Sequence, residues 1–289
     1  LGVSDPDDFF FQHLQRAYDE GAGERRFASV GAGSCELEIR LAEKLLASGR
    51  DHFVIESLDV NRSMIERGIA QAQAAGVTKQ VRPQLCDVNA WKPARPYDAM
   101  IANHSLHHLV ALEPLFDHIA RALPAHGRFI VSDMIGRNGH MRWPEALAIV
   151  NEYWAELPTS YRYDRQRFLQ LDAFENWDCA KDGFEGIRAQ DILPLLVERF
   201  SFDAFLAFAN VIDPFVERSF GPNFSVELEW DRAFIDRVHE RDEQELAAGR
   251  IKPTHLFAVM DNGRSSAGRF GGGLSPANAI RHPHRSLAA

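Results

Sequence analysis

The stretch FASVGAGSCELEIRL, residues 27–41, decides the fold. It opens on a short apolar run that predicts a buried strand, and from Glu36 onward leucines at helical spacing predict a helix. Between the two lie Gly31 and Gly33, which let the backbone turn sharply and approach a ligand without a Cβ in the way. Open α/β sheets bind nucleotides at such a turn after the first strand, although a plain strand–helix connection is the alternative.

The same alternation of short apolar runs and amphipathic stretches continues along the chain. It predicts an α/β fold built on a doubly wound, mostly parallel sheet of seven strands covered by helices. The expected strands are residues 27–30, 52–58, 81–86, 97–102, 128–133, 201–209 and 255–260, and the expected helices are residues 4–20, 36–46, 62–75, 112–123 and 189–198.

The places where this alternation holds and lapses divide the chain into segments. Aromatic residues are frequent in helical stretches such as PEALAIVNEYWAEL (144–157), which indicates a cap inserted into the sheet domain. The last segment is rich in glycine without periodic apolar residues, which predicts disorder. The segments are a helical segment at 1–25, a Rossmann-like cofactor-binding core at 26–135, a helical, aromatic-rich cap insertion at 136–188, the rest of the core at 189–260 with a second insertion at about 210–250, and a disordered tail at 261–289.

Composition and charge narrow the classes of function. The formal net charge of the 289 residues is −9, which leaves no overall basic field for nucleic acid or an anionic membrane. Three cysteines are too few for a disulfide framework and suit a reducing compartment. Residues 1–11 lack the pattern of a signal peptide, and no apolar run approaches the roughly 18 residues of a membrane span. We therefore expect a cytoplasmic protein, compatible with a homodimer, that binds neither nucleic acid nor membrane.

Acidic residues near strand ends discriminate between nucleotide cofactors. A dinucleotide fingerprint needs a third glycine at the position of Glu36, whose carboxylate would repel a pyrophosphate. This counts against a dehydrogenase that uses NAD or FAD and favours an adenosyl cofactor without phosphates. Asp59, after the second strand, can accept hydrogen bonds from both ribose hydroxyls, with a helix cap as its alternative role. Asp87, after the third strand, can accept from an adenine amino group, with Val88 as an apolar surface.

Class I S-adenosylmethionine-dependent methyltransferases have successive motifs that this chain resembles in order and spacing: VGAGSCELEIRLAEKL (30–45), SLDVNRSMIERG (57–68), LCDVNAW (85–91) and YDAMIANHSLHHL (97–109). The resemblance implies that the chain binds S-adenosylmethionine and releases S-adenosylhomocysteine. The cofactor-binding residues that it implies are Gly31, Ala32 and Gly33 for the methionine part, Asp59 with Val60 for the ribose, Met64 beside them, Asp87 with Val88 for the adenine, and Asn103 and His104 at the methionine end.

The chain departs from the family pattern at two positions. The family often has an acid two residues before the first glycine, where this chain has Ser29, and a third glycine in G-x-G-x-G, where this chain has Cys35. Both positions bear on how the amino group of the methionine part is held.

Three histidines, His104, His107 and His108, follow the fourth strand, where chemistry is expected on this fold. His104 and His108 could share a metal on a helix, but no third ligand of suitable spacing is evident, so we expect no metal. His107 or His108 could be a general base for the acceptor, and His108 is preferred because His107 lies close to His104. The alternative is that these imidazoles only shape the pocket, which methyl transfer tolerates because the sulfonium is already activated.

The methyl acceptor is expected beside the cofactor, under the insertion 136–188. Aromatic side chains of the insertion could line its pocket, or they could form the insertion's own small core. The candidate acceptor contacts are Phe11 and Tyr18 from the first helix, Trp143 from the insertion, and Arg137, His140 and Arg142 for a polar or anionic part, with solvated surface as the alternative for the last three.

These patterns together predict an S-adenosylmethionine-dependent methyltransferase that acts on a small molecule, most often on oxygen. The alternatives are methylation of nitrogen or carbon, a macromolecule methyltransferase that acts on RNA or protein, and a cofactor-binding module without turnover. The acidic balance argues against RNA. No N/D-P-P-Y run, typical of amino-group targets, follows the fourth strand, where the sequence is NHSLHHL (103–109).

Overall fold

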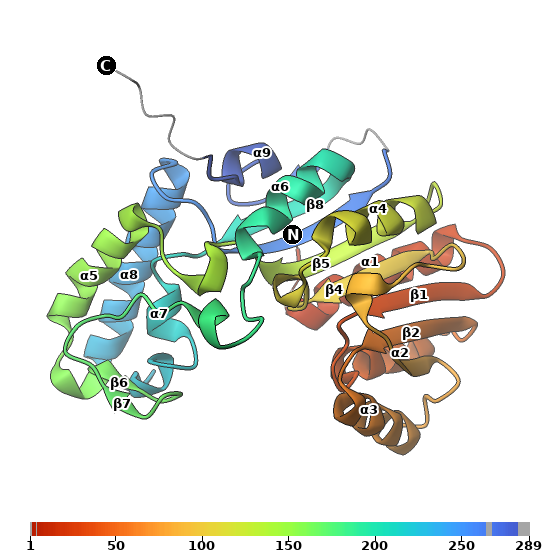
Figure 1. Cartoon of the computed structure of the whole chain (residues 1–289), viewed down its shortest axis with the longest axis horizontal. Coiled ribbons are helices and arrows are strands. Elements are labelled where there is room, and N and C mark those ends of the chain that lie inside the picture. The colour runs from red at the N-terminus through yellow and green to blue at the C-terminus, as the bar shows by residue number, and fades with distance from the viewer. Residues whose placement is uncertain (1, 4, 264–267, 283–289) are drawn as a thin grey trace.

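Eight strands of the described part of the chain form one central sheet (Figure 1). In the computed structural model, which describes residues 2–3, 5–263 and 268–282, the strand order is β10-β8-β9-β5-β4-β1-β2-β3. β9 runs antiparallel to both of its neighbours and the other pairs are parallel. The strands are β1 (Arg25–Val30), β2 (Phe53–Asp59), β3 (Val81–Leu85), β4 (Ala99–Asn103), β5 (Arg128–Met134), β8 (Ser201–Phe208), β9 (His255–Asp261) and β10 (Arg269–Phe270).

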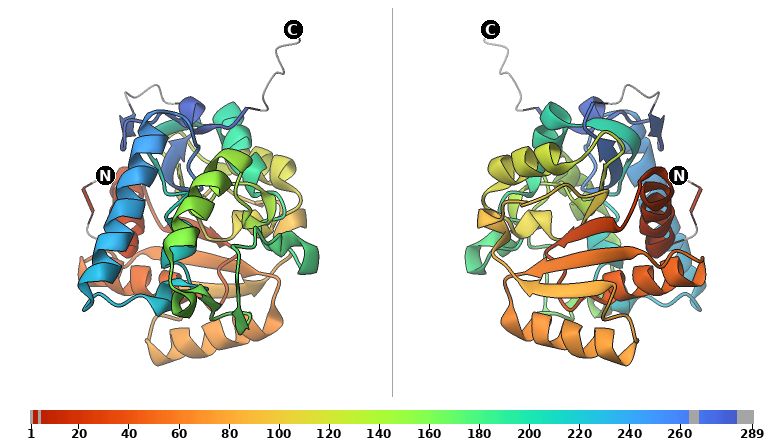
Figure 2. Two further views of the ribbon diagram at one scale, coloured as in Figure 1. Left: turned by 90° about the vertical axis from the view of Figure 1, so that its left-hand side faces the viewer. Right: turned by 90° about the vertical axis from the view of Figure 1, so that its right-hand side faces the viewer.

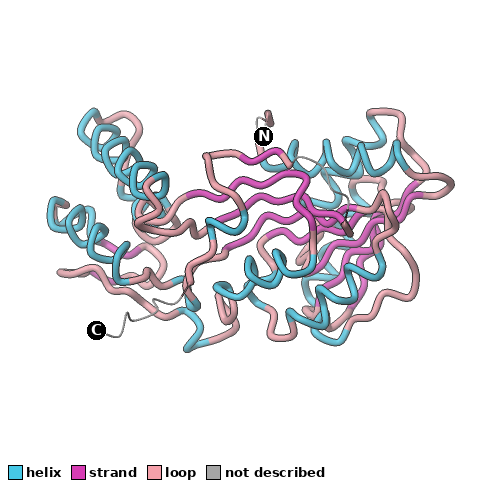
Figure 3. The backbone as a smooth tube through the Cα atoms, turned by 90° about the horizontal axis from the view of Figure 1, so that it is seen from above, coloured by secondary structure: helices cyan, strands magenta, loops and turns pink. Residues whose placement is uncertain are grey.

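Helices cover both faces of this sheet, so that the strands run between two helical layers (Figure 3). One face packs against α1 (Pro6–Glu20), α2 (Glu36–Ala47) and α3 (Arg62–Ala74), and the other packs against α4 (Leu112–Ala122), α6 (Ala189–Arg199) and α9 (Pro276–Ala279). Burial on both faces explains why the central strands β1, β4 and β5 read as largely apolar runs rather than alternating ones. Among the described residues, no helix combines the length and the apolar character needed to cross a bilayer.

The two insertions pack together in one lobe beyond the end of the sheet (Figures 1 and 2). Its helices are α5 (Pro144–Glu156), α7 (Asp213–Val216) and α8 (Glu229–Ala247), joined by a small hairpin of β6 (Tyr163–Asp164) and β7 (Leu169–Gln170). Tyr153 of α5 meets Phe234 of α8 edge to face, and Trp154 packs against Phe220. Aromatic rings of both insertions therefore share one core, whereas the sequence predicted at most a small core within the first insertion.

All seven predicted strands are present, with ends within two residues of the predicted ones. The count of seven is wrong because β10 adds an edge strand, parallel to β8. The prediction of a disordered tail is wrong for residues 268–282, where the Phe270 ring meets Phe205 and Ala279 is buried. These short elements are ordered by contacts with distant residues and carry no periodic pattern of their own. Residues 264–267 and 283–289 of the predicted tail lie outside the described residues.

Candidate active site

The glycine turn after β1 is held by the strand ends on either side of it. The backbone N–H of Ala32 donates to the Leu58 carbonyl (2.9 Å), and that of Gly33 donates to Asp59 Oδ2 (2.8 Å). Gly31 has φ +69°, and a Cβ there would lie 2.5 Å from the Cβ of Ser105, just after β4. Gly33 has φ +55°, and no described atom lies within 4 Å of its Cβ position. The turn is therefore a cradle with open space at Gly33, at the point between β1 and β4 where the strand order reverses.

Asp59 ends β2 with its carboxylate directed at this cradle. While Oδ2 accepts from Gly33, Oδ1 accepts from the N–H of Asn61 (2.8 Å). The cap of α3 is Asn61, whose side chain accepts from the N–H groups of Ser63 and Met64, so Asp59 does not serve as that cap. Its carboxylate is half-buried and remains accessible to a ligand beside the turn.

Asp87 follows β3, which pairs with β2, so both acids lie at one edge of the sheet. Asp87 Oδ1 accepts from the N–H of Asn89 (3.0 Å), and the side chain is exposed. Val60 is 68% exposed beside Asp59, whereas Val88 is 4% exposed and packs in the core, which leaves little of Val88 for contact with an adenine. Met64 is half-buried in the first turn of α3.

A buried carboxyl group that the sequence did not single out lies behind the glycine turn. Glu38 of α2 is 2% exposed, and Ser29 Oγ donates to its Oε1 (2.6 Å). Its Oε2 has no hydrogen-bond partner among the described residues, and burial raises the pKa of this carboxyl. Ser29 stands where the family often has an acid, so Glu38 brings a carboxyl group to that position from the next helix. The sequence signal was an acid on the apolar face of a helix, at Leu37–Ile39.

Cys35 stands where the family often has a third glycine, and it adopts the conformation that glycine favours there. Its φ is +61°, and the side chain is buried against Gly68, where a Cβ would lie 2.9 Å from Sγ. Burial raises the pKa of the Cys35 thiol to about 12, so it is not a reactive thiolate.

Asp133 of β5 organises the loop that follows β4. Its Oδ2 accepts from the N–H groups of Ser105 (2.9 Å) and Leu106 (2.8 Å), and its Oδ1 lies 2.6 Å from Nδ1 of His107. Both side chains of this pair are buried. Burial lowers the pKa of His107, but the hydrogen bond with Asp133 and the charges of Asp133 and Glu185 outweigh it, so that pKa is raised. His107 is therefore an imidazole fixed in one orientation by a buried acid. The sequence singled out His107 but not this acid, Asp133.

His108 and His104 lack this support. The His108 side chain is 43% exposed, and its Nδ1 lies 3.6 Å from Glu185 Oε2, while burial and the charge of His107 lower its pKa. The geometry thus favours His107 over His108 as the general base, whereas the sequence favoured His108. His104 follows Asn103 at the end of β4, with φ +49°, and its N–H donates to the Ser132 carbonyl (2.8 Å). Its backbone is therefore the fixed part of this residue, at the edge that faces the cradle.

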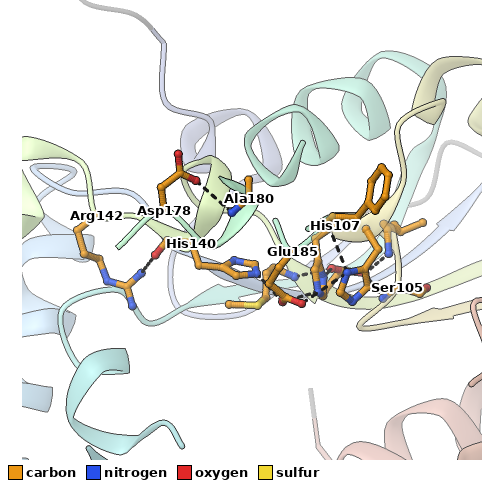
Figure 4. A network of polar contacts seen from close by, with 12 residues as sticks. Ser105, His107, His140, Arg142, Asp178, Ala180 and Glu185 are labelled. Carbon is orange, nitrogen blue, oxygen red and sulfur yellow. Dashed lines mark hydrogen bonds and ion pairs between the residues drawn. The ribbon is translucent and has the colours of Figure 1, made fainter. Parts of the chain in front are cut away.

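The structure brings His107, His140 and Glu185 together from three separate loops (Figure 4). Glu185 Oε1 lies 2.9 Å from Nε2 of His140 and 3.3 Å from Nε2 of His107. Burial raises the pKa of Glu185, but the hydrogen bond with His140 and the nearby imidazoles outweigh it, so that pKa is lowered and the group is a carboxylate. Glu185 lies in the segment GFEGIR (183–188), which gives no local sign of such a role. The residues that converge here are not His104 and His108, the pair that we considered for a shared metal from the sequence and set aside for want of a third ligand.

Comparisons with known proteins agree with this geometry. A family model described as a methyltransferase domain matches residues 9–188, more than half of the chain. The chain belongs to the class I S-adenosylmethionine-dependent methyltransferases. No curated protein matches its sequence.

Solved structures similar to this methyltransferase share little sequence with it. One is titled "StiE O-MT residues 961-1257", with 14% identity, a TM-score of 0.48 and coverage of 88% of this chain and 75% of that chain. Another is the geranyl diphosphate C-methyltransferase from Streptomyces coelicolor A3(2) with Mg2+, with 12% identity, a TM-score of 0.46 and coverage of 87% and 80%. A third is the [4+2]-cyclase SpnF, with 15% identity, a TM-score of 0.48 and coverage of 89% and 81%.

S-adenosylmethionine is the cofactor of this methyltransferase, and the residues of the cradle fit it. The open space at Gly33 admits a ligand close to the backbone. The unpartnered, buried Oε2 of Glu38 suits a cationic group such as the methionine ammonium. Asp59 supplies acceptor oxygens beside the same turn, as a ribose requires.

Two predicted acceptor contacts lie elsewhere in the methyltransferase. Tyr18 is at the amino edge of the sheet, where its hydroxyl accepts from the N–H of His52 just before β2 (3.3 Å) and Arg25 lies over its ring. Phe11 packs on the outside of α2, with Lys44 Nζ 5.9 Å from its ring centroid. The helical face that reaches the sheet is instead that of Phe9. Neither Tyr18 nor Phe11 closes an acceptor pocket. The prediction failed because helical periodicity does not tell which end of the sheet a residue reaches.

The predicted contacts of the insertion divide into two groups. Arg142 is buried and its Nη2 lies 3.0 Å from Asp213 Oδ2, so its charge is already paired. The guanidinium groups of Arg137 and Arg281 lie over the ring of Trp143, at 5.3 Å and 4.1 Å from its centroid, and Trp143 lines a separate hollow of about 310 Å³. Of the predicted acceptor contacts, His140 is the one that the structure brings to the cluster with His107.

A pocket of about 440 Å³ opens between the sheet and the lobe of the methyltransferase. The sheet contributes Met134 at the end of β5, Phe208 at the end of β8 and His255 at the start of β9, and the lobe contributes residues of α7 and α8. Met134 directly follows Asp133 in β5, but successive side chains of a strand point to opposite faces of the sheet, so the His107–Asp133 pair does not line this pocket. The pocket lies at the carboxyl edge, the same edge as the glycine turn.

Replacing Asp59 by alanine is expected to weaken binding of S-adenosylhomocysteine by about 10–100-fold, which corresponds to about 1–3 kcal/mol. The change removes acceptors for the ribose and the contact that holds Gly33. Isothermal titration calorimetry measures the effect. Asp51→Ala is the matched control, because Asp51 is exposed just before β2, at the opposite edge of the sheet. Equal affinity of both variants would contradict the assignment of Asp59.

Proposed function

We propose that this methyltransferase transfers the methyl group to an oxygen atom of a small molecule. The observation that most supports a small-molecule acceptor is the pocket of about 440 Å³ at the carboxyl edge, a volume typical of small-molecule sites. It lies at the same edge of the sheet as the cofactor cradle. The net charge of −9 argues against an RNA acceptor.

The polar lining of the pocket favours a neutral or basic acceptor over an anionic one. Acidic side chains of the lining are Asp213, Glu217, Asp242 and Glu243, against the imidazoles of His239 and His255. Arg142, a candidate for binding an anionic acceptor, is paired with Asp213. Burial raises the pKa of Asp242 to about 6, and the same burial disfavours the negative charge of an anionic acceptor.

The chain's residues have a limited task in this reaction. S-adenosylmethionine supplies a methyl group that is already activated as a sulfonium. The protein aligns the acceptor oxygen with that methyl group and excludes water, as the lobe does by covering the carboxyl edge. A hydroxyl is a weak acid and must also lose its proton. Polar groups that follow β4 and β5 at this edge of the sheet and can promote this loss are His107, His140 and Glu185.

The reaction class is tested by product analysis. The purified chain is incubated with S-adenosylmethionine, carrying a ¹³C-labelled methyl group, and a panel of small molecules that bear hydroxyl, amino or activated carbon positions. We expect a product heavier by one labelled CH₂ unit whose labelled carbon is bonded to oxygen in the NMR spectrum. A label attached to carbon, or transfer only to RNA or protein added in parallel, would contradict the proposal.

The pocket itself is tested with a pair of tryptophan variants. Val216 lines the pocket and is half exposed, so Val216→Trp fills the pocket without displacing a core residue. We expect the KM for the acceptor to rise about tenfold or more, as for overpacking of a site by 1–3 kcal/mol. Val226→Trp is the control, since Val226 is exposed and outside the pocket lining. An unchanged KM in Val216→Trp would place the acceptor elsewhere.

A further inference from the structure

Three side chains at the carboxyl edge of the sheet offer donor atoms to one point. They are His107 in the turn Leu106–His108 after β4, His140 in the turn Asn138–His140 after β5, and Glu185 shortly before α6. One donor atom from each lies within 4.8 Å of the other two. Figure 4 shows the imidazoles of His107 and His140 on either side of Glu185.

The spacing of these atoms fits a shared metal ion. Nitrogen and oxygen donors bind Zn²⁺ at about 2.0–2.2 Å, so two donors of one ion lie about 3–3.5 Å apart. Glu185 Oε1 lies 3.3 Å from His107 Nε2 and 2.9 Å from His140 Nε2. Small side-chain movements are therefore enough to place all three around one ion.

His107 is oriented for coordination by a buried acid. Its Nδ1 lies 2.6 Å from Asp133 Oδ1, and Asp133 also accepts from the N–H groups of Ser105, Leu106 and Met134. With Nδ1–H donating to Asp133, the lone pair of Nε2 faces Glu185. Metal-binding histidines almost always donate their second N–H to a carboxylate or carbonyl in this way.

The loops that carry His140 and Glu185 are tied to each other. The N–H of Gly139 donates to the carbonyl of Gly186 (2.9 Å). Gly186 has φ +66°, and a Cβ there would lie 3.0 Å from Cε1 of His140, so the close approach depends on glycine. His140 and Glu185 thus meet through a backbone contact that does not depend on their own side chains.

The charges of the cluster suit a divalent cation. Each side-chain partner of Glu185 in the described part of the chain is an imidazole, so no lysine or arginine neutralises it. Asp133 adds a second carboxylate, which contacts the ligand His107 rather than the ion. Neutral histidines with these two carboxylates balance a charge of +2.

We propose that His107, His140 and Glu185 bind one divalent transition-metal ion. Two imidazole nitrogens and one carboxylate suit Zn²⁺ and ions of its class, whereas Mg²⁺ and Ca²⁺ prefer oxygen donors. What the ion does in methyl transfer rests on the proposed function, while the binding itself does not. In the proposed methyl transfer, the bound ion lowers the pKa of the acceptor hydroxyl. The proton leaves to water, an oxygen electron pair forms the O–CH₃ bond, and the C–S pair remains on sulfur.

The site is tested by metal binding, without cofactor or acceptor. The tag-free full chain is stripped with EDTA, dialysed and titrated with Zn²⁺ by isothermal titration calorimetry. We expect one Zn²⁺ per chain and no comparable heat with Mg²⁺. His140→Ala and Glu185→Gln should each weaken Zn²⁺ binding by about 100-fold or more. His52→Ala, which removes an exposed imidazole before β2, should leave it unchanged.

The outcomes separate this proposal from the proposed function. Circular dichroism checks that each variant is folded. If His140→Ala does not fold, Glu185→Gln still tests the site, because glutamine keeps the shape of the glutamate side chain. No stoichiometric Zn²⁺ binding by the wild type, or equal binding by Glu185→Gln, would overturn the metal site. Zn²⁺ binding that both variants lose, in a chain that methylates no oxygen, would support the site and overturn the proposed reaction.

Discussion

Replacing His107 by alanine is expected to lower turnover by about 10²–10⁴-fold, the range for loss of a group that promotes proton transfer. His107 is 3% exposed, is held by Asp133 and directs its other nitrogen at Glu185. The affinity for S-adenosylhomocysteine should stay the same, because His107 acts toward the acceptor. Initial rates at saturating S-adenosylmethionine and calorimetry with S-adenosylhomocysteine measure the two effects.

His108→Ala is the informative partner of this variant. His108 is the next residue, is 43% exposed and has no buried acid beside it, so its loss should lower turnover by less than about tenfold. A larger loss in His108→Ala than in His107→Ala would restore the preference that the sequence suggested. Equal, small losses in both would leave alignment by the pocket as the mechanism.

Replacing Gly31 by alanine is expected to weaken S-adenosylhomocysteine binding by at least about 100-fold, as a displacement of about 1 Å in a positioning element does. Two effects act together, since φ +69° is costly for a residue with a Cβ and this Cβ would lie 2.5 Å from that of Ser105. The free energy of unfolding should fall by about 2–4 kcal/mol, from about 1 for the conformation and about 1–3 for the overlap. Calorimetry and urea denaturation measure these quantities.

Two further glycines separate the causes. Gly76→Ala has the conformational cost alone, since φ is +71° with no described atom within 4 Å of the Cβ position, far from the cradle after α3. It should lose about 1 kcal/mol of stability and keep its affinity for S-adenosylhomocysteine. Gly33→Ala should lose similar stability but also lose affinity, because its Cβ would enter the space that the cofactor needs. Unchanged affinity in Gly33→Ala would contradict the location of the cradle.

The fold of the core and the place of the cofactor could be predicted from the sequence because both depend on local signals. Apolar runs and helical periodicity gave the seven strands within two residues of their ends. Since parallel strands end at one edge, an acid after the second strand and one after the third had to lie near the glycine turn. Asp59 and Asp87 do lie at that edge.

Residues that reach the site from a helix face were not predictable in the same way. A helix pattern shows which residues share a face but not which end of the sheet that face reaches. Tyr18 therefore lies at the amino edge and Phe11 against α2. The carboxyl group of Glu38 was missed for the same reason, although it replaces in space the acid that is absent at Ser29.

The sequence by itself determined the α/β core, the glycine turn and the acids that face it, because neighbouring residues and strand order fix them. Tertiary structure alone decided that His107 pairs with Asp133, 26 residues away, and that Glu185 meets His140 across 45 residues. It also decided that residues from both insertions share one core beside the pocket. Contacts over such separations arise when loops pack at one edge of the sheet, and they leave no periodic pattern in the chain.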